Sequence, residues 1–352
     1  MSFLWRWIKR LFMLALIAVI SLMTPVIYVE TACRGTPVTN TYTPIVVEAD
    51  QRPESRTLLT YPEWHIVHAY DDYAAVIAKD DPHDFAYLSS IIGFWTSLCA
   101  LSQTAASHGG VPWETKQMVY TIGISFSAEL LLKAAYEETI GRVTTLIRGP
   151  EHSGLDVISA VQAADYATFL QQVPWYKWDF RRDALALDAM ALPGIATLRD
   201  RERSFALGIE YRTKAAYAKV IEAAVAGIGA DALTMRVIVK DIEPDALAQM
   251  AGVQVIAERP EGTEIETPRY RAFTDLARQL AGQGANFVEI AGNDDILYTA
   301  ITDTPDDLGA LHRFARQGNA GYRHLMLIKV ADLADQLRQP GPTVQIEHIH
   351  DY

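Results

Sequence analysis

Two histidines and an aspartate at helical spacing are the residues of this chain best placed to do chemistry. His65, His68 and Asp72 recur at positions i, i+3 and i+7, so on a helix they project from one side. Imidazole nitrogens and a carboxylate on one face can hold zinc, iron or copper if another element supplies further ligands, and Glu63 could be one of them. The alternative is a pair of structural histidines at a helix packing surface, which is the commoner arrangement in proteins.

A second cluster of possible metal ligands stands near the end of the sequence. Glu347, His348, His350 and Asp351 lie close together, and a strand would place both imidazoles on one face. Two histidines alone make a weak metal site, and terminal residues are often mobile. We therefore expect an edge strand or tail that carries these histidines incidentally.

Other signatures of chemistry are absent from the sequence. It has no Gly-x-Gly-x-x-Gly loop, no P-loop lysine motif and no His-Glu-x-x-His. Residues 123–127 lack the second glycine of a nucleophile elbow. Cys33 and Cys99 do not form a Cys-x-x-Cys motif. The two cysteines could form one disulfide in an oxidising compartment, or Cys99 could be a buried thiol and Cys33 a free one.

His65 and His68 belong to the first of several helices expected outside the N-terminal region. Residues 60–63 have the form of a capping box with Pro62 in the first turn, which predicts a helix to about Lys79. Periodicity predicts further helices over residues 85–107, 112–147, 153–172 and 195–226. Residues 85–107 carry no charge, but their serines and threonines favour a helix buried among others over a second membrane span. We expect an all-helical domain over residues 60–229.

A short segment between two of these helices combines aromatic rings with cations. It contains Trp175, Tyr176, Trp178, Arg181 and Arg182. Amphipathic rings and arginines are typical of a contact with the membrane interface. Pro174 makes the segment a short corner, however, so ordinary packing between helices is the alternative.

The pattern changes from a helical period to a strand period after Gly229. Residues 233–240 alternate as a strand, and a short helix follows at 245–250. From 253 to 330 the expected order is strand, helix, strand, strand, helix, strand, with a hairpin through residues 292–295. This order resembles ferredoxin-like domains, which host many functions. The expected fold class is α+β: an N-terminal transmembrane helix, an all-helical domain, and a ferredoxin-like α/β domain over 230–352 with a mainly antiparallel sheet and a C-terminal tail.

Residues 11–29 contain no charged side chain and are long enough to span the ~30 Å core of a bilayer as a helix. Arg6, Lys9 and Arg10 precede this run, so we expect a cytoplasmic N-terminus. A cleaved signal sequence is the alternative, but Glu30 is unsuitable near a cleavage site after Ala32. We expect residues 1–35 to form a cytoplasmic stub and anchor, residues 36–59 an extended tether, and the rest to be extracytoplasmic, or periplasmic if the cell has an outer membrane.

Two classes of function remain. The net charge of −12 and the lack of a basic cluster argue against nucleic acid as a partner. The first class is a non-catalytic binding or scaffolding protein at the membrane surface, with membrane lipid and another envelope protein as partners. The second is a metal-dependent envelope enzyme with its site around His65, His68 and Asp72. No motif in the sequence identifies catalytic residues, or a cofactor other than such a metal ion.

Overall fold

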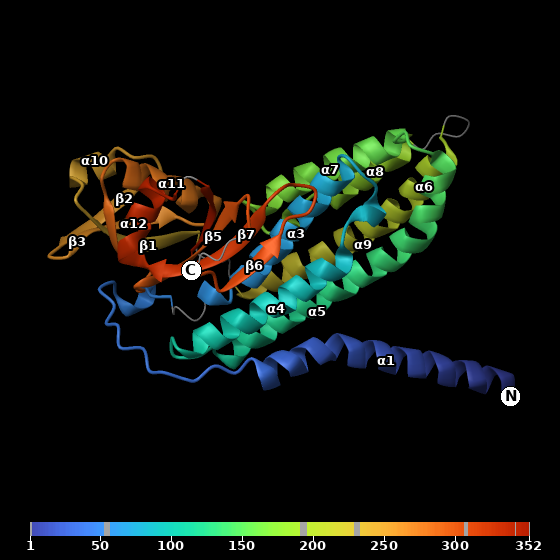
Figure 1. The fold of residues 1–352 in the computed structure, drawn as a ribbon, viewed down its shortest axis with the longest axis horizontal. Helices are drawn as coiled ribbons and strands as arrows, with labels where there is room; N and C mark the ends of the chain where they lie inside the picture. The colour runs from blue at the N-terminus through green and yellow to red at the C-terminus, as the bar shows by residue number, and fades with distance from the viewer. Residues whose placement is uncertain are drawn as a thin grey trace.

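The computed structural model describes residues 2–52, 57–190, 196–228, 233–305, 309–341 and 343–351. It is a mixed structure with 59% helix and 16% strand. The bundle of long helices and the two sheets occupy opposite ends of an elongated molecule, and the N-terminal helix runs along one side (Figure 1).

The helical end is a bundle of packed helices, which follow the order expected from the sequence except that α8 was not expected. Three of its connections contain short helical turns: η2 (Pro82–Asp84), the π-helical η3 (Glu137–Gly141) between α5 and α6, and η4 (Trp175–Lys177). The helices are α3 (Tyr61–Ile77), α4 (Tyr87–Ala106), α5 (Trp113–Tyr136), α6 (Arg142–Arg148), α7 (Gly154–Leu170), α8 (Phe180–Met190) and α9 (Leu198–Ile228).

A capping box begins α7, whereas α3 begins without one and has a proline in its first turn. Ser153 and Asp156 form a capping box at α7, in which the Ser153 hydroxyl accepts the Asp156 N–H at 3.2 Å and the Asp156 carboxylate accepts the Ser153 N–H at 3.0 Å. The capping box expected at α3 is not formed. The Thr60 hydroxyl instead donates to the Thr57 carbonyl at 2.7 Å, and Pro62 occupies the first turn.

The N-terminal helix α1 (Ser2–Ala32) is almost entirely exposed. By length and composition, two helical stretches, Trp5–Ala32 and Trp113–Arg148, could cross a membrane. A signal sequence or the core helix of a soluble protein can have the same composition, so this finding alone does not fix the topology.

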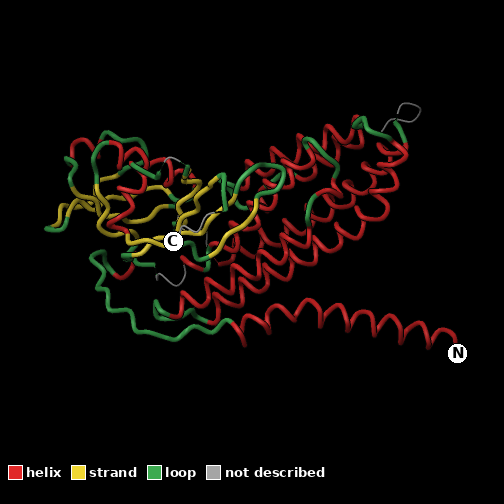
Figure 2. The backbone as a smooth tube through the Cα atoms, in the orientation of Figure 1, coloured by secondary structure: helices red, strands yellow, loops and turns green. Residues whose placement is uncertain are grey.

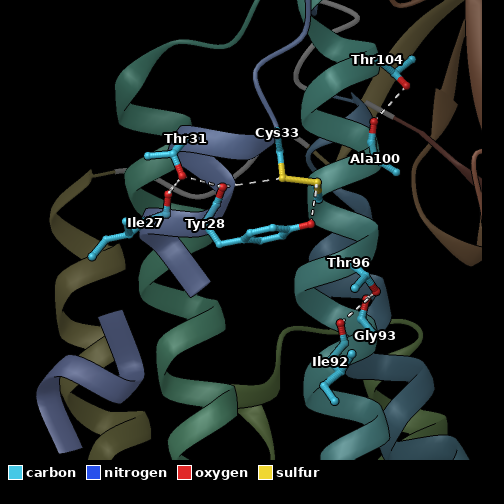
Figure 3. Close-up of a disulfide and its surroundings, with 10 residues drawn as sticks. Ile27, Tyr28, Thr31, Cys33, Ile92, Gly93, Thr96, Ala100 and Thr104 are labelled. Carbon is cyan, nitrogen blue, oxygen red and sulfur yellow. Dashed lines mark hydrogen bonds between the residues drawn. A yellow bond between two sulfur atoms is a disulfide. The ribbon is translucent and has the colours of Figure 1, made fainter. Parts of the chain in front are cut away.

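A disulfide joins the end of α1 to the bundle. Cys33, which follows α1, is bonded to Cys99 of α4, and the Cys33 side chain is buried. Figure 3 shows the ring of Tyr28 lying between α1 and α4 beside the bond. An ion pair lies on the same end of α1, where the Glu30 carboxylate accepts from Lys116 at 3.0 Å and from Tyr120 at 2.5 Å, both on α5. The C-terminal end of α1 is therefore fixed to both α4 and α5.

The segment after α1 connects this helix to the sheet end of the molecule. Its early part packs on α4, because Val38 donates to the Ala106 carbonyl at 3.0 Å. Further along, the buried carboxylate of Glu289 accepts from the Tyr42 hydroxyl and from the backbone N–H groups of Ile45 and Val46, at 2.6, 2.6 and 2.9 Å. Residues 42–46 of the expected tether are therefore packed against the sheet end, and the short turn η1 (Glu48–Asp50) follows them.

The sheet end contains two four-stranded antiparallel sheets with the same strand order. Sheet A has the order β2-β3-β1-β4 and sheet B the order β6-β7-β5-β8. The strands are β1 (Thr234–Lys240), β2 (Gln254–Arg259), β3 (Gly262–Pro268), β4 (Asn286–Ile290), β5 (Asp295–Thr302), β6 (His312–Ala315), β7 (Tyr322–Lys329) and β8 (Val344–His350), and the helices are α10 (Pro244–Ala248), α11 (Arg271–Gly282) and α12 (Val330–Arg338).

The ferredoxin-like arrangement expected over residues 253–330 is not confirmed. The turn after β4 does not form a hairpin with β5 but passes the chain from sheet A to sheet B. Ala291 and Gly292 have positive φ values of 49° and 84° there, and Ala291 accepts a backbone hydrogen bond from Arg52 at 2.7 Å. The predicted order has a helix directly after its first strand, but a second strand, formed by residues 262–268, comes between them. The helix that this order places before the last strand is absent from described residues 303–305 and 309–311.

Figure 2 shows the strands gathered at one end of the molecule, beside the ends of the long helices. Residues on both faces of sheet B are buried. On one face, Ile296, Tyr298 and Ala300 pack with sheet A, α11 and α12 in a single apolar core. On the other face, Leu297 and Leu325 pack into the core of the helical bundle. Sheet B is therefore the layer that joins the two halves of the molecule.

Candidate functional site

Helix α3 places the predicted metal ligands against sheet B. His65, His68 and Asp72 are all buried, with 6 to 7% of each residue exposed. Tyr61 and Trp64, one helical turn earlier, are buried on the same side. The polar face of α3 is therefore turned into the junction between the bundle and the sheet and not toward solvent.

Strand β8 supplies the opposite side of this junction through a β-bulge. Its pairing with β5 changes register so that Ile346 is opposite Ala300 and His348 is opposite Thr299, which leaves Glu347 as the extra residue. A bulge interrupts the alternation of side chains along a strand. Ile346 and Ile349 both remain in the sheet core, while the side chains of Glu347, His348 and His350 contact α3 or β7.

The two histidine clusters, which lie far apart in the sequence, come together between α3 and β8. The centroids of the Trp64 and His348 rings are 3.6 Å apart, and those of the Tyr61 and His350 rings are 5.2 Å apart. The His68 Nε2 atom lies 3.7 Å from a carboxylate oxygen of Glu347. We name the set of buried polar residues at this interface the junction cluster: Tyr61, His65, His68, Asp72, Arg323, Glu347, His348 and His350.

Arg323 of β7 provides the positive charge of the junction cluster. It is 2% exposed and donates from Nε and Nη2 to the two carboxylate oxygens of Glu347, at 2.5 and 2.7 Å. Its Nη1 atom is 3.8 Å from the Asp72 carboxylate. Asp72 also accepts the Gln317 N–H at 3.2 Å, which holds the loop after β6 on α3. A planar guanidinium with two carboxylates can satisfy its charge when it is buried in this way.

His65 has a structural contact that explains its position. Its Nε2 atom lies 2.8 Å from the Ser90 carbonyl oxygen of α4, and its ring packs against Phe94, Phe126 and Phe314. Gly93 makes room for this ring, because a Cβ atom there would be 3.0 Å from the imidazole. The His65 ring therefore joins α3 to α4 in the apolar core.

Several buried polar atoms of the junction cluster have no hydrogen-bond partner among the residues that the structure describes. They are Tyr61 Oη, His68 Nε2, Asp72 Oδ1, His348 Nε2 and both ring nitrogens of His350. An unpaired buried polar group costs about 1–3 kcal/mol, so a concentration of them in one place is typical of a functional or water-filled site. The cluster is the candidate functional site of this protein on that ground.

Burial sets the protonation of the cluster. It lowers the pKa of His65 to about 4 and of His350 to about 3, and it lowers the pKa of His68 and His348 well below 6.5. The Arg323 charge lowers the pKa of His65 and His68 further. For Asp72, burial raises the pKa to about 6 although Arg323 opposes the rise. The imidazoles are therefore neutral at pH 7. His65 Nε2 and His348 Nδ1 have hydrogen-bond partners, the Ser90 carbonyl and the Thr274 hydroxyl, whereas His68 Nε2, His348 Nε2 and both His350 ring nitrogens have none among the described residues.

Neutral imidazoles beside a carboxylate can bind a metal ion or accept a proton. Among the residues that the structure describes, three candidate ligand atoms lie within 4.8 Å of one another only at Asp81, His83 and Asp84. That group is partly exposed and lies in the short turn η2 before α4. In the junction cluster the closest such pair is His68 with Glu347, whose carboxylate already binds Arg323. A metal ion there would require a shift of His348 or His350.

The aromatic corner expected at the membrane interface packs on the bundle. The Trp178 indole donates to Asp183 at 2.6 Å and its ring contacts Tyr166 and Phe169, while Trp175 stacks on Tyr217. Tyr176 contacts the edge of Trp175, and Arg182 lies over Trp178 and pairs with Asp183. Arg181 is exposed. Each of the two tryptophans is only partly exposed, so most of the aromatic surface of this corner faces the protein.

The sequence did not identify Arg323 or Gln317 as members of the site. Both lie far from α3 in the chain, and neither has a local spacing that marks it. The only available signal was that two histidine clusters occurred in one chain, and nothing in either cluster indicated that they would meet.

Comparison with known proteins finds no matching family model, no matching curated protein and no matching solved structure. The function is therefore argued from this structure alone.

Replacing Arg323 by methionine should strongly destabilise the protein. Glu347 and Asp72 would remain buried without their cation, which costs about 3–5 kcal/mol of unfolding free energy. The double variant R323M/E347M should lose less than R323M alone, because it removes the charge left unpaired. Denaturant titration of the full chain in detergent measures this. The exposed Arg212–Asp188 pair gives the control, R212M, with an expected loss of at most about 1 kcal/mol. An R323M loss no larger than that of R212M would contradict the assignment.

Acid should destabilise the native state through the histidines of the junction cluster. Their native pKa values are lowered, so their contribution is complete above pH 6.5 and is lost as the pH falls toward about 3 to 4. Asp72 acts in the opposite sense, because its contribution is lost as the pH rises from 3.8 to about 6. His350→Phe should remove about 2 kcal/mol of the loss between pH 8 and pH 5. Unfolding titrations at both pH values, with His152→Gln as the control outside the cluster, test this. An unchanged pH dependence in His350→Phe would refute it.

Proposed function

We propose that this is a single-pass membrane protein, anchored by α1 with its N-terminus in the cytoplasm and the rest of the chain outside. The observation that carries the proposal is the disulfide between Cys33 and Cys99 at the end of an exposed apolar helix. Disulfides persist in oxidising compartments, whereas a 31-residue helix that buries almost none of its apolar surface in the protein needs an apolar solvent. Both requirements are met when the disulfide lies just outside the membrane.

The charges around α1 support the orientation. Arg6, Lys9 and Arg10 lie before its apolar stretch, and Glu30 lies at its other end in an ion pair with Lys116. Positive charges are retained on the cytoplasmic side. The Trp5 and Trp7 rings are exposed at one end and Tyr28 at the other, as interfacial residues would be.

Outside the membrane the protein acts as a binding or scaffolding protein, with membrane lipid and another envelope protein as its partners. The Arg323–Glu347 pair and the buried rings of the junction cluster join the bundle to sheet B through side chains that are closed to solvent, which favours a structural role for this interface over a catalytic one. Sheet A, with the order β1-α10-β2-β3-α11-β4, further supports a ferredoxin-like unit over residues 234–290, and sheet B repeats its strand order.

The meeting of His68 with Glu347, His348 and His350 favours one alternative, a metal-dependent envelope enzyme. His65 and Asp72 are then supporting residues, because their polar atoms bind Ser90 and Gln317. In that case the neutral imidazoles and the carboxylate would hold the ion.

A reporter fusion tests the topology. Alkaline phosphatase, which folds only in an oxidising compartment, should be active when it is fused after the full chain, and a fluorescent protein that matures in the cytoplasm should stay dark there. The same reporters fused to a chain that lacks residues 2–32 are the control and should reverse the pattern. If the phosphatase fusion of the full chain is expressed at a normal level but is inactive, the proposed orientation is wrong.

Metal analysis separates the alternative from the proposal. If the enzyme reading holds, the purified full chain exposed to zinc and then desalted should retain one zinc ion, and His68→Ala or His350→Ala should release it. His152→Ala, outside the cluster, is the matched control. On the binding-protein proposal, the wild type retains no more zinc than the two cluster variants.

A further inference from the structure

The way α1 joins the bundle brings α5 to the level of the membrane. The outer end of α1 is fixed by Cys33–Cys99 to α4, and Glu30 binds Lys116 and Tyr120 near the start of α5. From this point α5 extends toward the same end of the molecule as the N-terminal part of α1, and the two helices diverge (Figure 1). If α1 spans the bilayer, as proposed above, α5 therefore extends from the outer membrane surface into the part of the bilayer that α1 crosses.

The exposed surface of α5 is uncharged over this stretch. Residues 118–135, all of which the structure describes, form about 27 Å of helix at ~1.5 Å per residue. That length is close to the ~30 Å of a bilayer core. Leu132 is 74% exposed, Leu131 41% and Met118 50%. The remaining exposed residues of the stretch are Thr121, Ser125 and Ala135.

The two charged residues within this stretch, Glu129 and Lys133, are partly buried and paired with α9. Glu129 pairs with Lys214 of α9 at 2.7 Å, and Lys133 pairs with Glu210 of α9 at 3.3 Å. The Tyr70 hydroxyl also donates to Glu129 at 2.6 Å. Ionisable residues that pair inside a bundle whose outer face is apolar are typical of helices in contact with lipid. A water-exposed helix would more often place them on its outer face.

The depth of the exposed leucines can be matched to α1. Leu131 lies as many residues from Tyr120 as Val19 lies from Glu30, about 17 Å along either helix at ~1.5 Å per residue. The angle between the helices reduces the depth reached by α5. Trp113, 59% exposed, lies at the outer end of α5, where an interfacial aromatic residue is favoured.

We propose that the outer face of α5 around Leu131 and Leu132 contacts the hydrocarbon core of the bilayer beside α1. This inference rests on the proposed membrane span of α1 and modifies the proposed placement of the rest of the chain, because part of the helical bundle then lies in the membrane and not wholly outside it. The occupant of this face is lipid, since the face continues the lipid-exposed surface of the anchor to which α5 is fixed.

Quenching of site-specific fluorescence tests the inference. The full chain is prepared with single added cysteines at Leu132, Leu131, Ile20 or Gln254, all of them sites outside the protein core. The two native cysteines are bonded, so a thiol-reactive bimane labels only the added residue. Each labelled protein is reconstituted into phosphatidylcholine vesicles and quenched with nitroxide-labelled lipid or with iodide in water. Ile20 reports on the α1 span, and Gln254, on the sheet end, is the aqueous control.

We expect nitroxide lipid to reduce the emission at Leu132 and Leu131 to an extent comparable with that at Ile20, and iodide to quench only Gln254. If Ile20 is quenched by lipid but both leucines are quenched by iodide, the anchor stands and the inference is wrong. If the leucines are shielded from both quenchers, a protein surface such as a second copy covers them, which also overturns it. Quenching of Ile20 by iodide rejects the α1 span and this inference with it.

Discussion

The burial of Arg323 between α3 and sheet B is the constraint on which the rest of the structure depends. A guanidinium removed from water must be paired, and here Glu347 binds it through two hydrogen bonds while Asp72 lies nearby. These three residues come from β7, β8 and α3, so the pairing requires that the bundle and the sheet be joined before the charge is buried. The pairing therefore ties residues of the helical half directly to residues of the sheet half.

The two sheets use different residues at corresponding positions to hold a segment from the N-terminal half of the chain. Both have the same strand order, and in each a bulge interrupts the pairing between the first and the last strand. The residue after the bulge is Glu289 in sheet A and His348 in sheet B. Glu289 binds residues 42–46, whereas the His348 ring packs on Trp64. In both sheets a polar residue at this position thus holds a segment from the N-terminal half of the chain.

Much of the helical part could be predicted from the sequence, because a helix is marked by residues that are close in the chain. Pro62 and Ser153 lie at helix starts that were expected, and the uncharged residues 85–107 form a helix that is largely buried. The sheets were harder. The alternating acidic residues Glu264 and Glu266 made β3 resemble a loop, although Glu264 is buried and paired with Arg259.

Only part of the candidate site could be predicted from the sequence, because spacing reveals only residues that are close in the chain. His65, His68 and Asp72 share a helical face, which spacing can reveal. Their partners on β7 and β8 are set by a strand order and a bulge that depend on contacts across about 250 residues. No local pattern records such contacts, so the sequence does not indicate Arg323 and predicts only an incidental role for the histidines of β8.

The position of β8 has a consequence for the order in which the protein is assembled. β8 follows the other described helices and strands, yet it supplies Glu347 and His350 to an interface with α3, one of the earliest helices. Because synthesis starts at the N-terminus, α3 is made long before β8. During that interval the polar face that α3 buries in the native structure lacks its partners on β8 and is open to chaperones or to premature association.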